Sequence, residues 1–270
     1  MKADLHVHSN YSDGSDDVQT VLKKARENGV TVLSFVDHDS TNGLSEKQAL
    51  GAEYGIKIIP GIEISAYDFK RNRKVHVLGY HYDSNAKQME ALCQTIRQRR
   101  NDHTLWQIEQ LKASGYEIDR QAVIDSAYPS NTIFKQHVMR QLTTAPYPST
   151  AYQQLYQRLF KGNGPAAGDI TYVDACIAVE AIVADGGVAV LAHPGQLDSY
   201  DIIPELIEAG LGGIERNHPD HSANDHQRIE KIAANYDLIM TGGTDYHGEF
   251  GKPIEIGSIS SPLPLVTEKY

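Results

Sequence analysis

Histidine is the residue type in this sequence whose number and spacing point most directly to chemistry, with 12 copies in 270 residues. Asp4, His6 and His8 alternate along a run typical of a strand, and side chains two residues apart on a strand project from the same face. Two imidazoles on one face can bind one metal ion. Taken alone, the pair is explained equally well as two surface histidines, so the other strands must decide between these interpretations.

Most of the other expected strands also carry a potential metal ligand at or near one end. In β/α barrels the functional site is built at the carboxyl ends of the strands, so these side chains are expected to meet at one mouth. Nine donors exceed the needs of one ion and favour two or three divalent ions, with Mn, Fe or Zn preferred over Mg or Ca because the donors mix imidazole and carboxylate. The expected ligands are His6, His8, Asp13, His38, Glu63, His76, His193, Asp245 and His247.

Hydrolysis of a phosphoester is the reaction that fits such a cluster. Neighbouring divalent ions lower the pKa of bound water to about 7 and hold the attacking and leaving oxygens of an in-line displacement. We expect a metal-bound water as nucleophile, since these motifs contain no cysteine and the chain has neither GxSxG nor GxxxxGK[ST]. The side chains expected around this water are Asp13, His38, His193 and His247. Asp4, Asp37 and Asp39 either orient histidine ligands or serve as ordinary caps and surface residues.

The elements that must position these ligands follow one another as β-α units, because short β-branched runs alternate with helical patterns. Seven strands alternating with helices favour a closed or nearly closed parallel (β/α)7 barrel, similar to a TIM barrel, over an open sheet. Strand order is not encoded in these patterns. Strands are predicted at 3–7, 31–36, 57–62, 75–80, 188–192, 213–216 and 238–241, and helices at 16–29, 45–54, 174–185, 201–209 and 224–235.

The region 85–167 interrupts this alternation, since it has helical patterns and no predicted strand. Residues 1–84 and 168–270 are therefore assigned to the barrel, and 85–167 to a small inserted helical cap. Nine Lys or Arg against six Asp or Glu between residues 89 and 165 give the insert a charge of +3, which leaves −13 for the rest of a chain with net charge −10. This asymmetry fits either a solvated helix surface or a cationic lid over an anionic substrate.

Composition excludes several classes of protein. Hydrophobic residues make up 40% and charged residues 22%, as in ordinary globular proteins, and no run approaches 18 apolar residues. Cys93 and Cys176 lie far apart without metal-binding or disulfide spacing, which favours a reducing cytoplasm. The net charge of −10 argues against duplex nucleic acid as a partner, and no membrane partner is expected.

Seven motifs carry the expected ligands along the chain: Asp4-Leu5-His6-Val7-His8-Ser9, Tyr11-Ser12-Asp13-Gly14, Asp37-His38-Asp39, Pro60-Gly61-Ile62-Glu63, His76-Val77-Leu78-Gly79-Tyr80, Ala192-His193-Pro194 and Thr244-Asp245-Tyr246-His247. In this order they resemble the motifs of the PHP (polymerase and histidinol phosphatase) superfamily. The resemblance covers nearly the whole chain and implies a distorted (β/α)7 barrel with a trinuclear metal centre. It assigns the first ion to His6, His8, Glu63 and Asp245, the second to Asp13, His38 and His247, and the third to His76, His193 and a bridging Glu63.

The helical insert is similar to that of a superfamily branch that hydrolyses small nucleotides, including 3′,5′-nucleoside bisphosphates, and in some members trims RNA from the 5′ end. That branch places basic residues of the insert on the substrate phosphate. Arg100 stands where one of its arginines is expected, but Lys135 replaces another, and His103 and Asn163 also stand at basic positions. Because lysine lacks the bidentate fork of arginine, the preference for a nucleotide does not follow from the motifs alone.

The predicted function is a metal-dependent phosphatase that hydrolyses a phosphate monoester of a small metabolite. A nucleotide is the first candidate, either a nucleoside 3′,5′-bisphosphate or a monophosphate. Histidinol phosphate and the 5′ ends of short RNA are the alternatives, and a non-catalytic metal-binding domain is the least favoured. The residues expected to contact the substrate phosphate are Arg100, Lys135, His218 and Arg216, the last two because they lie at or just beyond the end of the strand at 213–216.

Overall fold

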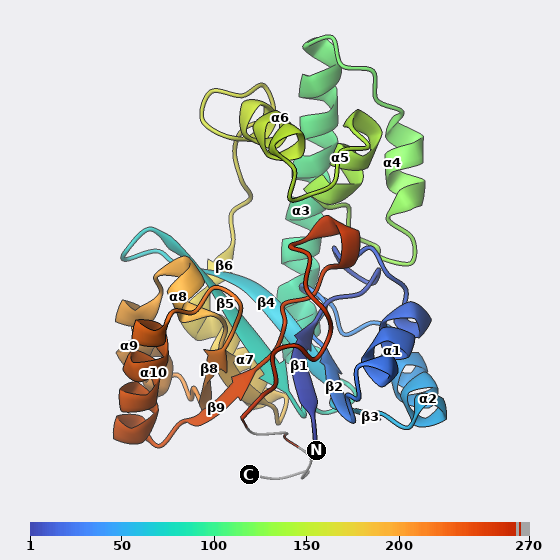
Figure 1. Cartoon of the computed structure of the whole chain (residues 1–270). Coiled ribbons are helices and arrows are strands. Elements are labelled where there is room, and N and C mark those ends of the chain that lie inside the picture. The colour runs from blue at the N-terminus through green and yellow to red at the C-terminus, as the bar shows by residue number, and fades with distance from the viewer. Residues whose placement is uncertain (263–264, 266–270) are drawn as a thin grey trace.

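The computed structural model describes residues 1–262 and 265, and its strands form two sheets beneath a group of helices (Figure 1). The smaller sheet is parallel, in the order β1 (Ala3–Val7), β2 (Val32–Phe35), β3 (Lys57–Ile58). The larger sheet has the order β6-β4-β5-β7-β8-β9. Its strands are β4 (Gly61–Asp68), β5 (Arg73–Tyr80), β6 (Val173–Asp174), β7 (Val188–Leu191), β8 (Gly213–Asn217) and β9 (Ile239–Gly242).

The larger sheet is mixed, which corrects the expectation of parallel strands throughout. β4 and β5 form an antiparallel hairpin, and β5 also runs antiparallel to β7. The strand expected at 57–62 is divided between β3 and β4 at Pro60, a residue that cannot donate a ladder hydrogen bond. Isolated bridges from Val7 to Tyr246 and from His38 to Glu63 connect the two sheets. The chain is therefore an α/β protein with one parallel and one mixed sheet, joined at these two bridges.

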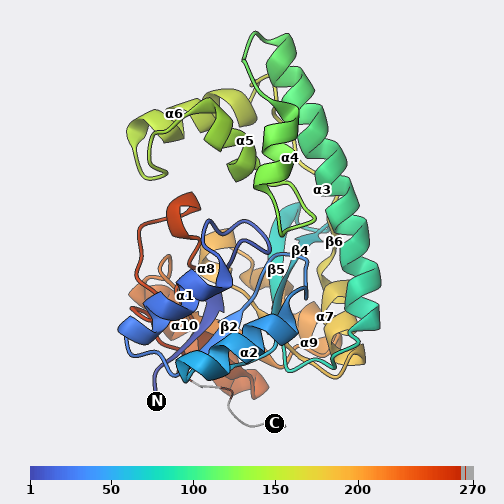
Figure 2. The same ribbon diagram turned by 90° about the vertical axis from the view of Figure 1, so that its right-hand side faces the viewer.

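Helices cover the outer faces of the sheets (Figures 1 and 2). In α1 (Val18–Glu27), Asp17 caps the N-terminus by accepting a hydrogen bond from the backbone N–H of Thr20. Val21 and Leu22 are among the buried apolar residues of this helix, which recur at helical spacing. The helix predicted at 16–29 is thus confirmed. The helices on these faces are α1 (Val18–Glu27), α2 (Leu44–Tyr54), α7 (Ala175–Ala184), α9 (Ile203–Glu208) and α10 (Ala223–Tyr236). The short helix α8 (Pro194–Leu197) and the 3-10 turn η1 (Tyr200–Ile202) follow β7, and the 3-10 turn η2 (Gly248–Phe250) follows β9.

Four further helices rise above the sheets: α3 (Lys87–Ala113), α4 (Arg120–Ser126), α5 (Lys135–Leu142) and α6 (Thr150–Phe160). The first part of α3 packs into the main hydrophobic core through Met89, Cys93 and Ile96. Its outer part belongs to a separate apolar cluster through Ile108 and Leu111, together with side chains of α4, α5 and α6. Figure 2 shows α3 as one continuous helix that extends from the sheets to the helices above them. None of the described helices is long and apolar enough to cross a membrane.

Candidate metal centre and substrate cavity

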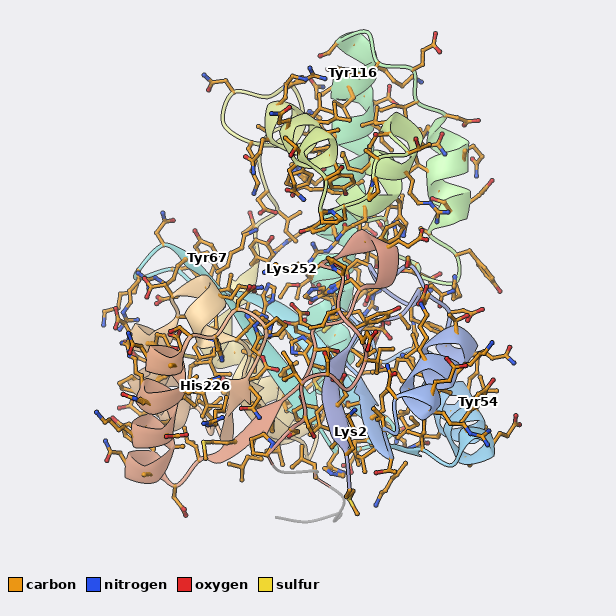
Figure 3. The ribbon with its side chains drawn as sticks, in the orientation of Figure 1. Lys2, Tyr54, Tyr67, Tyr116, His226 and Lys252 are labelled. Carbon is orange, nitrogen blue, oxygen red and sulfur yellow. The ribbon has the colours of Figure 1, made fainter. Side chains whose placement is uncertain are left out.

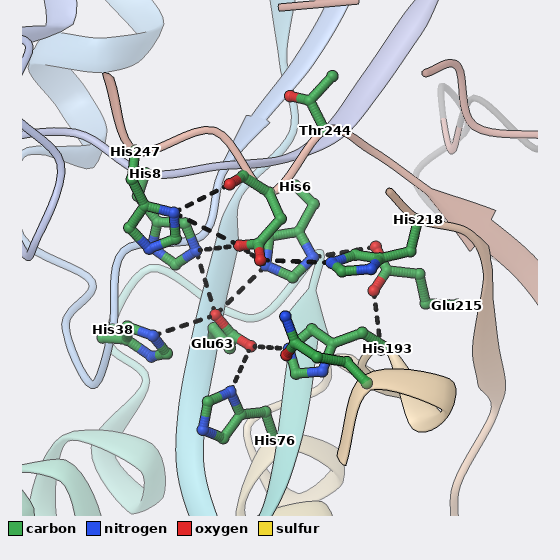
Figure 4. Close-up of polar contacts among 12 residues, drawn as sticks. His6, His8, His38, Glu63, His76, His193, Glu215, His218, Thr244 and His247 are labelled. Carbon is green, nitrogen blue, oxygen red and sulfur yellow. Dashed lines mark hydrogen bonds and ion pairs between the residues drawn. The ribbon is translucent and has the colours of Figure 1, made fainter. Parts of the chain in front are cut away.

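Glu63, the third residue of β4, lies at the centre of a buried histidine cluster (Figure 4). One carboxylate oxygen, Oε1, lies 2.9 Å from both His76 Nδ1 and His193 Nε2. The other, Oε2, faces three more imidazoles, at 3.3 Å from His6, 3.1 Å from His8 and 3.5 Å from His38. These five imidazoles come from β1, β5 and the segments after β1, β2 and β7, so the fold brings together residues spread over almost 190 positions of the chain.

Two more carboxylates and a sixth imidazole extend the cluster on one side. Asp245 Oδ1 lies 3.3 Å from His6 Nε2 and 3.4 Å from His8 Nε2, and Asp13 Oδ1 lies 3.4 Å from His247 Nε2. All nine expected ligands therefore lie in one place. Ligand atoms within 4.8 Å of one another form three overlapping groups: His8, Asp13, His38 and His247; His6, His8, Glu63 and Asp245; and His38, Glu63 and His76.

Burial alone would raise the pKa of Glu63, but the surrounding imidazoles, led by His38 and His6, hold it well below its usual value. Burial would likewise raise the pKa of Asp245, but the surrounding imidazoles, led by His6 and His247, keep it well below its usual value. Burial lowers the pKa of His38 to about 4. At neutral pH the carboxylates are thus ionised and His38 is neutral, which are the protonation states that bind metal ions.

The donor set fits divalent cations. His8 is fully buried, and burial opposes its protonation. The adjacent carboxylates of Asp245 and Glu63 nevertheless raise its pKa to about 10, so a positive charge is stabilised at this place. Divalent ions would satisfy that demand while leaving the imidazoles neutral. His193 Nδ1 is buried and has no hydrogen-bond partner among the described residues. Such closely spaced carboxylates and imidazoles are typical ligands of Mn, Fe and Zn.

Glu215 is a buried member of this environment that the sequence analysis did not identify. His6 Nδ1 lies 2.9 Å from Glu215 Oε1, and the backbone N–H of His193 donates to Oε2 at 2.8 Å. A carboxylate on the second nitrogen of a histidine fixes which nitrogen faces a metal. The available signal was an acidic residue in the middle of a predicted strand.

The three aspartates considered for that orienting role bind other groups instead. Asp4 accepts hydrogen bonds from the backbone N–H groups of Thr244 and Gly257. Asp37 accepts from Ser9 and Ser12 and pairs with the buried Lys47 at 2.6 Å, and Asp39 accepts from the backbone N–H of Ser65 and from Arg100. These bonds organise the loops that carry the expected ligands, while Glu215 contacts the ring of the expected ligand His6 directly.

A cavity of about 450 Å³ opens above the cluster. His38, His76 and Asp245 belong to the wall nearest the cluster. The opposite wall comes from helices α3, α5 and α6, and includes Arg100 and Lys135. A small anionic molecule held in this cavity would therefore lie between the cluster and cationic side chains.

Three of the four residues expected on the substrate phosphate line this cavity. Arg100 donates through Nη2 to Asp39 at 2.9 Å and to Ser65 at 3.0 Å, while its buried Nε has no hydrogen-bond partner in the described part of the chain. His218 is buried with Nε2 3.3 Å from Asp245 Oδ2. Burial lowers the pKa of Lys135 to about 8, against the opposing charge of Asp169.

Arg216 does not reach the cavity. Its Nε donates to Glu230 of α10 at 2.8 Å, and its Nη1 donates to Asn217. The expectation rested on its position at a strand end, but alternate residues of a strand face opposite sides, and Glu215 takes the inward position in β8. The guanidinium therefore covers the outer surface.

Comparisons with known proteins agree with this geometry. The model of the PHP domain family matches residues 4–173. The chain is 51% identical over 257 residues to phosphoribosyl 1,2-cyclic phosphate 1,2-diphosphodiesterase of Eggerthella lenta, covering 95% of this chain and 98% of that protein. It is 29% identical over 261 residues to 3′,5′-nucleoside bisphosphate phosphatase of Chromobacterium violaceum, covering 93% and 90%.

Solved structures show the same architecture. A protein from Bifidobacterium adolescentis described as a metal-dependent phosphoesterase aligns with a TM-score of 0.86 and 27% identity, covering 96% of this chain and 92% of that one. An amidohydrolase from Chromobacterium violaceum aligns with a TM-score of 0.83 and 26% identity, covering 96% and 91%. With its buried cluster of imidazoles and carboxylates, this chain belongs to the PHP domain family and is a metal-dependent hydrolase of phosphoester bonds.

Proposed function

We propose that this protein hydrolyses a phosphoester of a small ribose phosphate, with the cyclic phosphodiester of a phosphoribosyl 1,2-cyclic phosphate as its first substrate. The single observation that carries the reaction type is the buried group of imidazoles and carboxylates, nine side chains with His193 included, at the base of a cavity with a cationic opposite wall. The sugar is supported by the 51% identity to the Eggerthella lenta diphosphodiesterase over nearly all of both chains. Nucleoside 3′,5′-bisphosphate is the second candidate, favoured by the 29% identical phosphatase.

Two or three divalent ions, of Mn, Fe or Zn, would be held by three sets of side chains. When bound, such ions polarise the phosphoryl oxygens and lower the pKa of coordinated water to about 7. Glu63 would serve two sets, because its two oxygens face different imidazoles. The sets are His6, His8, Glu63 and Asp245; Asp13, His38 and His247; and Glu63, His76 and His193.

Other side chains would position the reacting phosphate. Arg100 has an unpartnered Nε at the cavity and is fixed by Asp39 and Ser65, so it would neutralise a phosphoryl oxygen without losing much conformational entropy. His218 would donate a hydrogen bond from the same wall as Asp245. Glu215 would keep His6 in the tautomer that presents Nε2 to the cluster.

The helical region 85–167 would act as the cap of this site, with 1–84 and 168–270 as the barrel domain. The support is that the outer part of α3 and helices α4 to α6 share a hydrophobic cluster of their own while contributing the cavity wall opposite the metal-binding side chains. Residues 89–165 of this region carry a charge of +3, which would favour anionic substrates.

Phosphate ester hydrolysis by purified protein, loaded with Mn²⁺ and assayed with and without chelator, tests the proposal. The panel contains phosphoribosyl 1,2-cyclic phosphate, 3′,5′-adenosine bisphosphate, AMP, histidinol phosphate and a short 5′-phosphorylated RNA. We expect chelator-sensitive turnover of the ribose phosphates and loss of turnover in His193→Ala. His226→Ala, on the outer helix α10 (Figure 3), is the matched control and should keep full activity.

Each other outcome has a clear meaning. Full activity after verified metal removal would contradict metal-dependent hydrolysis. Turnover of histidinol phosphate alone would overturn the ribose phosphate as substrate, and turnover of RNA alone would indicate 5′-end trimming. Bound metal without turnover of any compound would favour a non-catalytic metal-binding domain.

A further inference from the structure

The face of the β4–β5 hairpin that carries the metal-binding side chains continues beyond them into the cavity. Ser65 is paired with His76, and two residues further along Tyr67 is paired with Lys74. Residues two apart on a strand share a face and are separated by about 7 Å along it. Figure 3 labels Tyr67 at the upper edge of this hairpin, and Lys74 lines the cavity. The strand thus sets a fixed distance between the metal cluster and Lys74.

Lys74 belongs to a small polar group at this distal end of the cavity. Its ammonium lies 2.5 Å from Asp169 Oδ2 and 5.1 Å from the centre of the Tyr172 ring. The hydroxyl of Tyr172 donates to Asp169 Oδ1 at 2.8 Å. The side chains of Lys74 and Asp169 are 39% and 34% exposed, so both charges face the cavity rather than the core. The hydrogen bonds hold them in place before any ligand arrives.

Lys135 faces the same end from helix α5 and makes no ion pair within the described residues. With Lys74 and Lys135 positive and Asp169 negative, the group carries one net positive charge. A site for a bare phosphate would contain cations and neutral donors alone, because a carboxylate repels a phosphate oxygen. A carboxylate is suited to accept a hydrogen bond from a hydroxyl. The group therefore matches a ligand with one anionic centre and one neighbouring hydroxyl.

We propose that the distal end of the cavity selects a sugar phosphate, with Lys74 and Lys135 binding a second, non-reacting phosphate and Asp169 accepting a hydrogen bond from the sugar hydroxyl next to it. The inference rests on the proposed function, since it needs the reacting phosphoester at the metal cluster. In a ribose whose O1 and O2 form the cyclic phosphate, only O3 and O5 are available. A second phosphate on O5 leaves the 3-hydroxyl as the group for Asp169.

The test compares hydrolysis of three cyclic phosphates by the Mn²⁺-loaded enzyme: ribose 1,2-cyclic phosphate with a 5-phosphate, the same compound without the 5-phosphate, and its 5-phosphorylated 3-deoxy analogue. For Lys74→Met we expect the preference for the 5-phosphorylated over the unphosphorylated sugar, as a ratio of kcat/KM, to fall about tenfold to a hundredfold, mostly through KM. Lys74→Arg should restore most of the preference, and the exposed Lys23→Met is the matched control.

The hydroxyl contact is tested separately with Asp169→Asn. The wild-type enzyme should prefer the 3-hydroxy over the 3-deoxy sugar by about tenfold, and the variant should lose most of this preference, as expected for two groups that interact directly. Equal losses on all three sugars, or unchanged preferences in both variants, would overturn the distal subsite while leaving the proposed reaction intact. Absence of chelator-sensitive hydrolysis of every sugar would instead overturn the proposed function.

Discussion

Glu215 shows how a single residue can organise the proposed metal site without being one of its proposed ligands. It is fully buried, its Oε1 faces His6 Nδ1 at 2.9 Å, and its Oε2 accepts from the backbone of His193. It therefore fixes both a side chain of β1 and the segment after β7. Loss of its charge affects two ligands at once, although no ligand is removed.

Glu215→Gln should weaken metal binding about tenfold to a hundredfold, because the amide no longer stabilises the His6 tautomer that faces the cluster. Metal content after dialysis against buffered Mn²⁺, together with kcat at saturating metal, measures the effect. Glu230→Gln, which alters a carboxylate on the outer helix α10, should leave both unchanged. Wild-type metal content in Glu215→Gln would show that the contact is dispensable.

Lys135 should give substrate binding a pH dependence of its own. Burial lowers its pKa to about 8, while Asp169 opposes this shift and Lys74, Lys161 and Arg100 add to it. A lysine loses its positive charge above its pKa, so attraction for a second phosphate should decline as pH rises through about 8. The ratio of kcat/KM for the 5-phosphorylated and unphosphorylated sugars, measured between pH 6.5 and 9.5, checks this.

Arginine stays protonated throughout that range, so Lys135→Arg should abolish the decline. The ratio is informative because titration of the metal centre changes kcat/KM for both sugars alike, so that its effect cancels in the ratio. A ratio that is constant with pH in the wild-type enzyme would show that Lys135 does not contact the second phosphate.

At the scale of the elements, close contact between β1 and the end of β9 holds the two sheets in register. A Cβ placed on Gly243 would lie 2.4 Å from the backbone nitrogen of His6 and 2.6 Å from Asp4 Oδ1. No side chain fits there, so Gly243 lets the segment carrying Asp245 and His247 pass directly against β1.

Gly243→Ala should therefore lower the free energy of unfolding by about 1–3 kcal/mol and weaken metal binding, because the two segments must move apart. Urea unfolding of the metal-free protein and Mn²⁺ titration measure the two effects. Gly212→Ala is a milder control, since its nearest neighbour is the end of the Val188 side chain at 3.2 Å. If Gly243→Ala behaves like this control, β9 can shift without disturbing the site.

The sequence indicated which residues gather at the site better than it indicated how the strands run. Side chains such as His6 and His8 follow a local period of two, which is visible in the chain. The β4–β5 hairpin was missed because its pairing depends on contacts between strands, and the continuous apolar run 57–62 concealed the break at Pro60. Glu215 was overlooked and Arg216 was expected at the cavity for a related reason, since the face that each presents depends on the register of β8.

At the scale of the whole molecule, the metal centre should act as a clamp between the two sheets. The proposed ligands lie on β1, β4 and β5 and in the segments that follow β1, β2, β7 and β9, so ions that bind there stabilise the native state only when these elements are assembled. Binding at a hundred times the dissociation constant adds about 2.7 kcal/mol to the free energy of unfolding.

Chelation should consequently lower Tm by roughly 5–10 °C for each ion lost at that concentration, and Mn²⁺ should restore it. Differential scanning calorimetry of the dialysed and reloaded protein, with metal content measured in each sample, checks the effect. The chelator should change Tm much less in Asp13→Asn/Glu63→Gln, which lacks two of the carboxylates. An unchanged Tm after verified metal removal from the wild type would contradict the clamp.

The continuity of α3 has a consequence for how the protein tolerates insertions and for the design of chimaeras. Its inner turns belong to the main core and its outer turns to the cluster above, so one helix fixes the angle between them. Adding a single residue between Ile96 and Ile108 would rotate everything beyond it by about 100° and advance it by about 1.5 Å. Length changes in that stretch should therefore survive in steps of about seven residues, which complete two turns. A helical region grafted from a relative should therefore be joined within α3, so that the helix continues with the same rotation per residue across the junction. A junction near residue 85, where the helical region begins, is less suitable.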